Sequence, residues 1–124
     1  MTGVQTCALP IFDFDAVESS NLQRQVIHTT DRVGMPKVES AAVQIRALNP
    51  DVQVEAIDGA LDVGNVASLL EGVDVVIDGT DTFEARYALN DAAVRLGIPV
   101  VHAGVFRFEG QLTVLAPEIG RAHV

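Results

Sequence analysis

The strongest constraint on the fold of this chain is the alternation of strand-like and helix-like segments along its middle. Residues 52–57 alternate apolar and polar side chains as a half-buried strand does, and residues 73–77 form a short β-branched run. The spacing of apolar residues predicts helices over 38–48 and 83–96. Strands separated by helices of this length pair in parallel through right-handed crossovers. The pattern therefore predicts an α/β protein with a doubly wound, Rossmann-like parallel sheet.

Shorter segments complete this pattern. Residues 12–15 resemble the end of a buried strand, residues 63–70 a short helix, and residues 100–102 and 111–115 two further strands. The polar loop over 18–34 is long for a compact domain, which usually marks a functional segment.

The predicted sheet lacks the unit that commonly binds phosphate in such folds. No G-x-G-x-x-G motif occurs in the chain, and Gly104 and Gly110 are too far apart to form one. We therefore expect an incomplete sheet that begins at its second strand, without the first strand and its glycine-rich turn.

The two ends of the chain do not resemble the rest. One possible coding of residues 119–124, read on the opposite strand in another frame, gives residues 6–10, and both strings resemble translated sequencing-adapter DNA. We therefore predict that residues 1–11 and 118–124 are non-native, and that residues 12–117 are the authentic part of the domain.

Composition excludes several classes of function. The 124 residues carry 17 acidic and 8 basic side chains, a net charge of −9, which disfavours nonspecific binding to nucleic acid or anionic membranes. No apolar run reaches the roughly 18 residues that a membrane span needs. The single cysteine, Cys7, excludes an internal disulfide and a four-cysteine zinc site within these residues.

Polar residues follow the predicted strands, at the edge where open parallel sheets bind ligands. Asp13 or Asp15 could bind the ribose hydroxyls of a nucleotide. It is equally consistent with the sequence that either carboxylate only stabilises a turn. Asp81 precedes a predicted helix, where it is either an N-cap or an oxygen ligand for Mg²⁺.

Two cations stand in the long polar stretch. Taken singly, Arg24 and Lys37 are typical solvated surface charges. Together with a carboxylate at a strand end, they could bind a triphosphate. His28 and His102 have no metal-ligand spacing and are interpreted as structural. The chain shows no serine–histidine or cysteine–histidine arrangement, so any nucleophile has to come from the substrate.

A set of spaced motifs then resembles one protein family. The strings are DFD at 13–15, SNLQRQ at 20–25 and GMPKVES at 34–40, with DGTD at 78–81 and EGQ at 109–111 as further matches. Over residues 12–117 the chain resembles the ubiquitin-activating-like adenylyltransferases, nearest to the bacterial molybdopterin-synthase and thiamine sulfur-carrier adenylyltransferases (MoeB/ThiF type).

The resemblance implies an ATP-dependent enzyme. Such enzymes adenylylate the C-terminal glycine carboxylate of a ubiquitin-like sulfur-carrier protein with Mg·ATP and release pyrophosphate. The resemblance also implies a cytoplasmic homodimer that binds no nucleic acid or membrane. A zinc site, where the family has one, would lie outside this chain, and the fragment alone is expected to be inactive.

The resemblance also assigns roles to residues. Asp13 should bind ribose, Asn21, Arg24 and Lys37 should contact the phosphates, and Asp81 should hold Mg²⁺. Most members carry Asn at the position of Thr82. The catalytic set implied is Arg24, Lys37 and Asp81, and the nucleotide-binding set is Asp13, Ser20, Asn21, Leu22, Gln23, Arg24, Gln25, Lys37, Asp81 and Thr82.

Two other functions are consistent with parts of this pattern. An NAD-dependent Rossmann oxidoreductase would also use a strand-end acid on ribose, but it gives no reason for Arg24, Lys37 and Asp81 to occur together. A non-catalytic partner subunit of the same fold typically loses the arginine, lysine or aspartate, and this chain has all three.

Overall fold

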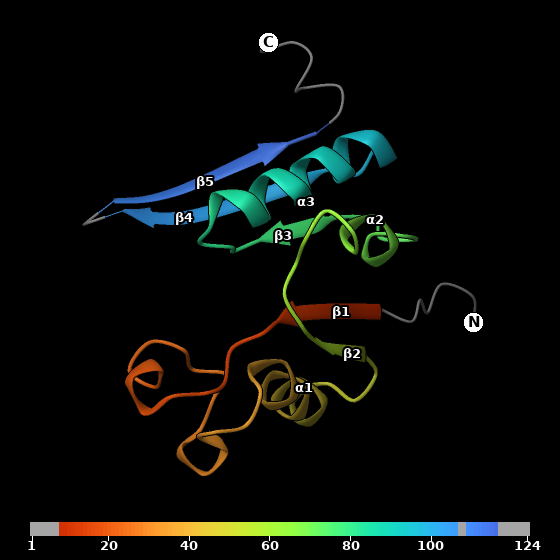
Figure 1. The fold of residues 1–124 in the computed structure, drawn as a ribbon. Helices are drawn as coiled ribbons and strands as arrows, with labels where there is room; N and C mark the ends of the chain where they lie inside the picture. Colours follow the sequence, from red (N-terminus) through yellow and green to blue (C-terminus); the bar gives the residue numbers. More distant parts are fainter. Residues whose placement is uncertain (1–7, 107–108, 117–124) are drawn as a thin grey trace. The chain divides into compact units, whose positions relative to one another are not determined.

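The computed structural model describes residues 8–106 and 109–116. The chain divides into two compact units, unit 1 over Met1–Ala60 and unit 2 over Leu61–Val124, and each has its own sheet (Figure 1). Helices alternate with parallel-paired strands in both units. The predicted α/β class and Rossmann-like parallel pairing are therefore confirmed.

Unit 1 is built around one parallel crossover. Strand β1 (Ala8–Asp13) pairs with β2 (Gln53–Asp58) in a register that runs from Ala8 opposite Gln53 to Asp13 opposite Asp58. Helix α1 (Lys37–Leu48) connects the two strands and packs against both. Its buried Val38 and Ala42 lie on the face that helical spacing assigns to the interior, whereas the buried Ser40 lies on another side of the helix and contacts His28 and Arg32 of the preceding loop.

The long loop between β1 and α1 is closed at its base. Ala16 and Pro36 form an isolated bridge, the Val17 N–H donates to Met35 O (2.8 Å), and the Gly34 N–H donates to Val17 O (2.8 Å). Val17 is almost completely buried there. Short 3₁₀ turns at Ser19–Asn21 and Thr30–Arg32 give the enclosed residues regular structure. The loop is thus a folded projection of unit 1.

Unit 2 combines a parallel pair with a hairpin. Strand β3 (Val76–Asp78) pairs in parallel with β4 (Val100–Phe106), and β4 pairs antiparallel with β5 (Glu109–Leu115). Helix α2 (Val66–Leu69) precedes β3, and α3 (Phe83–Leu96) follows it.

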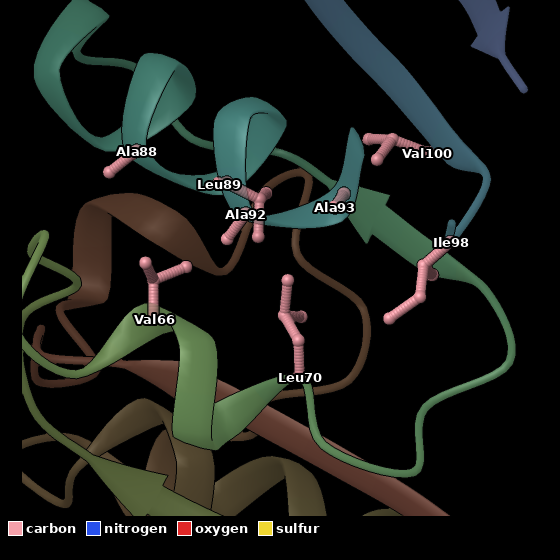
Figure 2. Packing of buried hydrophobic residues seen from close by; sticks show 8 residues of the cluster. All are labelled: Val66, Leu70, Ala88, Leu89, Ala92, Ala93, Ile98 and Val100. Carbon is pink, nitrogen blue, oxygen red and sulfur yellow. The ribbon is translucent and has the colours of Figure 1, made fainter. Parts of the chain in front are cut away.

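Unit 2 has a compact apolar core between its helices and strands. Figure 2 shows side chains of α2, α3 and the start of β4 converging on one cluster. Small residues on α3 allow close packing against α2, and Leu89 fills the space between them. The cluster consists of Val66, Leu70, Ala88, Leu89, Ala92, Ala93, Ile98 and Val100.

Three expected elements differ from the structure. The strand at 111–115 belongs to β5, which is antiparallel because two residues between β4 and β5 cannot form a parallel crossover. The expected helix at 63–70 is reduced to α2, since the Asp62 carboxylate caps Gly64 and Asn65 N–H groups in a turn. The strand expected at 73–77 starts later, at Val76, and includes Asp78.

The sheets are incomplete in the expected way. Among the described residues, β1 is paired only with β2, and β3 only with β4, so one edge of each is open. Strand β1 begins at Ala8 and therefore contains four residues of the segment predicted to be non-native. Residues 1–7 and 117–124 lie outside the described part, so the boundary at Phe12 stays a prediction.

A cavity mutation tests the core of unit 2. Leu89→Ala removes a buried side chain from the cluster, and we expect the free energy of unfolding to fall by about 2–5 kcal/mol. Val94→Ala, on the exposed face of the same helix, is the matched control and should change it by less than about 0.5 kcal/mol. Urea unfolding measures both. Equal effects of the two changes would contradict the packing of α3 described above.

Candidate functional site

Asp13 is the last residue of β1, at the carboxyl end of the parallel pair. Its carbonyl oxygen accepts a hydrogen bond from the Gly59 N–H (3.0 Å), and its Oδ1 accepts one from the Asp15 N–H (2.9 Å). Its Oδ2 makes no hydrogen bond to the described residues. Asp13 therefore binds its own turn with one oxygen, while the other is free of hydrogen bonds to the described residues.

A cavity of about 280 Å³ opens beside this carboxylate within unit 1. Asp13, Gln25, His28 and Lys37 supply its polar lining. Apolar side chains from β1, α1 and the loop supply the rest, namely Ile11, Phe12, Ile27, Val38, Ala41 and Ile45. An apolar hollow with a few convergent polar groups is the usual form of a small-molecule site. The cavity favours Asp13 over Asp15 as the ligand-binding acid, because only Asp13 lines it.

Lys37 is fixed at the start of α1. Its backbone N–H donates to Asp15 O (2.8 Å), and its Nζ lies 3.9 Å from Asp15 Oδ2. That contact is long and the Asp15 carboxylate is exposed, so it leaves the ammonium able to bind another anion. The structure thus brings Asp13, Gln25 and Lys37 together, as members of the predicted nucleotide-binding set.

The remaining predicted residues of the loop differ in exposure. Asn21 is buried, and its Oδ1 accepts a hydrogen bond from the Glu18 N–H (3.0 Å), so it holds the loop together. Arg24 is exposed and donates to Ser20 O (3.2 Å), away from the lining of the cavity. Leu22 and Gln25 are partly buried, whereas Ser20 and Gln23 are exposed.

A buried polar network holds the loop onto α1, and its main member was missed by the sequence reasoning. The Arg32 guanidinium donates through Nη1 to Ser40 O (2.8 Å) and Ile27 O (3.2 Å), and through Nη2 to Gln44 Oε1 (2.7 Å). It also donates to Ser40 Oγ (3.2 Å), and all four acceptors are neutral, so Arg32 is a buried cation without a carboxylate partner among the described residues. No local pattern in the sequence marked Arg32 as buried.

His28 belongs to the same network, in line with its predicted structural role. Its Nδ1 lies 2.7 Å from Ser40 Oγ. Burial lowers the pKa of His28, and the positive charges of Lys37 and Arg32 lower it further against an opposing effect of Asp13. The structure therefore favours the neutral imidazole at the floor of the cavity.

In unit 2, the turn after β3 contains the predicted metal ligand. Thr82 is the N-cap of α3, because its Oγ1 accepts a hydrogen bond from the Ala85 N–H (3.3 Å). The N-cap alternative for Asp81 is therefore wrong, and Thr82 has a structural role. Asp81 is exposed, and its carboxylate has no hydrogen-bond or ion-pair partner among the described residues.

Asp78 begins this turn and has a buried carboxylate. The sequence predicted that Asp78 lies in the turn, whereas the structure makes it the last residue of β3. Asp78 ends β3, has no exposed side-chain surface, and lies 2.7 Å from His102 Nδ1 on β4 and 3.7 Å from Arg86 Nε on α3. The Asp78 and His102 atoms are close but not aligned as a hydrogen bond. The structural role of His102 stays a prediction, and this contact with Asp78 is consistent with it.

The described residues do not contain a protein-made metal cage. No group of three or more His, Cys, Asp and Glu side chains within them is placed to hold a metal ion. One unpaired carboxylate such as Asp81 still suits Mg²⁺, which commonly takes one or two carboxylates together with substrate phosphates. No helix in the described part is long and apolar enough to cross a membrane.

Comparison with known proteins gives this arrangement its context. The model of the ThiF family matches residues 1–122. The chain is 52% identical over 110 residues to the SAMP-activating enzyme E1 of Haloferax volcanii and 39% identical over 110 residues to the molybdopterin-synthase adenylyltransferase of Haemophilus influenzae. These alignments cover 89% of this chain but only 41% and 45% of the relatives, so the chain spans less than half of their length.

A solved structure supports the same relation. The chain resembles the E. coli tRNA N6-threonylcarbamoyladenosine dehydratase TcdA in complex with ATP, with a TM-score of 0.73 and 32% identity. The match covers 81% of this chain and 43% of that one.

The environment of His28 predicts a dependence of stability on pH. Because its pKa is lower in the folded than in the unfolded chain, the folded state binds fewer protons, and stability should fall as the pH decreases through about 6.5. His28→Asn, which keeps a polar group near Ser40 but does not titrate, should flatten that part of the profile. Thermal midpoints between about pH 8 and pH 5 measure the difference. Parallel profiles for the two proteins would contradict it.

Proposed function

Because the chain belongs to the ThiF family, we propose that the protein it is part of adenylylates a ubiquitin-like sulfur-carrier protein. A C-terminal glycine carboxylate oxygen of the carrier attacks the α-phosphorus of ATP. The bond from that phosphorus to the bridging oxygen breaks, and pyrophosphate leaves with the electron pair. The products are an acyl-adenylate and pyrophosphate, so the protein supplies no nucleophile.

The cavity in unit 1 is the observation that carries this proposal. It joins an acid with a free oxygen, Asp13, to a lysine, Lys37, above an apolar lining that suits a nucleoside. Asp13 would bind the ribose hydroxyls, and Lys37 would act as a point charge on the phosphates. Arg24, exposed on the loop, would turn towards the phosphates when they bind. The ATP complex of the related TcdA supports a nucleotide as the ligand.

Asp81 would hold Mg²⁺ in this scheme. Its carboxylate is exposed and free of internal partners in the described part of the chain, which fits a metal shared with substrate phosphates. When bound, the metal neutralises charge on the phosphates as pyrophosphate departs. Thr82 supports this site indirectly by capping α3, whereas most members have Asn there.

Among the described residues, β1 and β3 each have one edge without a paired strand, and the proposed phosphate site would also use a glycine-rich turn that these residues do not contain. The homodimer, the cytoplasmic location and the choice of sulfur carrier, for molybdopterin, thiamine or another thiolation route, remain parts of this proposal.

Two alternatives are weaker. An oxidoreductase would use Asp13 to bind ribose but gives no role to Lys37 and Asp81. A non-catalytic partner subunit would not retain all three of Arg24, Lys37 and Asp81. Carrier-dependent exchange between ATP and pyrophosphate separates them, because neither alternative catalyses it.

The role of Asp81 is tested in a full-length protein that contains this chain. Asp81→Asn keeps the size of the side chain but weakens its hold on a cation, and we expect the exchange rate to fall by about 10²–10³. The thermal midpoint should stay nearly constant, because Thr82 and not Asp81 caps α3. Asp74→Asn, an exposed acid in the same unit, is the control. Near-normal exchange at saturating Mg²⁺ would reject the metal role.

The need for a glycine-rich turn is tested by binding. Calorimetry should detect no tight Mg·ATP binding to residues 12–117, because the backbone N–H groups of a glycine-rich turn are absent from them. A full-length protein that contains this chain should bind Mg·ATP. Exposed strand edges should also make the short form prone to aggregation. Micromolar binding by residues 12–117 would contradict the expectation.

A further inference from the structure

The turn that carries Asp81 is anchored by a carboxylate beneath it. Asp78 Oδ1 accepts hydrogen bonds from the Thr80 N–H (2.8 Å) and the Thr80 Oγ1–H (2.6 Å). Asp78 is buried, and a buried carboxylate is stable only when its oxygens have polar partners. These two bonds fix the first half of the turn against the end of β3.

Arg86 fixes the second half of the same turn. Its Nη2 donates to Thr80 O (2.7 Å) and, at a longer 3.4 Å, to Ala103 O on β4. Its Nε lies 3.7 Å from Asp78 Oδ2, so one guanidinium spans the carboxylate, the turn and the neighbouring strand. Arginine suits this task because its donors form a rigid planar fork.

These contacts together fix the peptide unit between Thr80 and Asp81. Thr80 has its N–H and hydroxyl bound by Asp78 and its carbonyl bound by Arg86. That carbonyl belongs to the peptide whose nitrogen is that of Asp81, so Arg86 fixes the plane from which Asp81 projects. On the other side, Thr82 is fixed as the cap of α3. Asp81 therefore has a free carboxylate on a backbone held from both sides.

We propose that Arg86 is a positioning residue for Asp81, which it orients through the Thr80 carbonyl. This rests on the proposed role of Asp81 as the magnesium ligand. A ligand held in advance loses little freedom when the cation binds, and partners of this kind commonly change metal affinity by 10- to 100-fold. Arg86 thus raises the affinity for the cation without touching it.

The test uses the full-length protein and follows carrier-dependent ATP–pyrophosphate exchange as a function of Mg²⁺. Arg86→Lys keeps the charge but loses the fork, and we expect the Mg²⁺ concentration at half-maximal rate to rise about tenfold. The KM for the carrier should stay constant, and the rise of the thermal midpoint in the presence of a non-hydrolysable ATP analogue should require about tenfold more Mg²⁺. Arg95→Lys is the matched control, because Arg95 lies exposed on the same helix and pairs only with Asp91 among the described residues.

A double-mutant cycle separates positioning from general stability. In the Asp81→Asn background, Arg86→Lys should produce no further rise in the Mg²⁺ requirement, since the ligand it orients is gone. Should Arg86→Lys fail to fold, Thr80→Val replaces it, because it removes only the hydroxyl bond to Asp78 and should raise the requirement in the same direction.

The outcomes distinguish the two proposals. Absence of exchange in the unaltered protein would overturn the proposed function itself. Normal exchange with an unchanged Mg²⁺ requirement in the Arg86 variant, or additive effects with Asp81→Asn, would overturn the positioning role alone.

Discussion

Parallel pairing of neighbouring strands determines where the chemistry of this chain can lie. In a parallel pair the carboxyl ends coincide, so Asp13 lies opposite Asp58 in unit 1 and, in a separate sheet, Asp78 lies opposite His102 in unit 2. Strands β1 and β3 each end on an aspartate, Asp13 and Asp78, at the point where the backbone leaves the sheet. This geometry places Asp13 at a strand end and Asp81 in the turn that follows β3.

Three basic residues of this acidic chain are concentrated in one segment of unit 1. The net charge of −9 repels a polyphosphate at long range, yet Arg24, Arg32 and Lys37, three of the eight basic residues, lie within one loop and the helix start that follows it. Arg32 is buried against neutral acceptors, so its charge is not cancelled locally. A buried cation in low dielectric acts over a longer distance than a surface one. It thereby adds to the field of Lys37, and it contributes to lowering the pKa of His28, after burial and Lys37.

Local signals in the sequence predicted some elements well and others poorly. Helix α3 has the predicted bounds, because Thr82 caps its start and Gly97, with a φ of 71°, ends it in a conformation that suits glycine. The direction of β5 and the shortness of α2 depend on connection length and a competing turn, which apolar periodicity does not report. Asp13 and Lys37 were found because their motifs are local. Arg32 and Arg86 were missed, since the acceptors that each guanidinium binds are brought together by other elements of the fold.

The two missed arginines use the same physical device. Arg32 joins the loop over 18–34 to α1 through carbonyl and amide oxygens, and Arg86 joins the turn after β3 to α3 and β4. In both cases a guanidinium holds a backbone segment, while the exposed Arg24 and Asp81 of those segments make no ion pair with the described residues. Lysine has no planar fork and could not bridge two elements in this way. A site for a charged substrate needs binding residues that do not also stabilise the fold. In the proposed site, Arg32 and Arg86 hold the backbone, and the exposed Arg24 and Asp81 would bind the substrate.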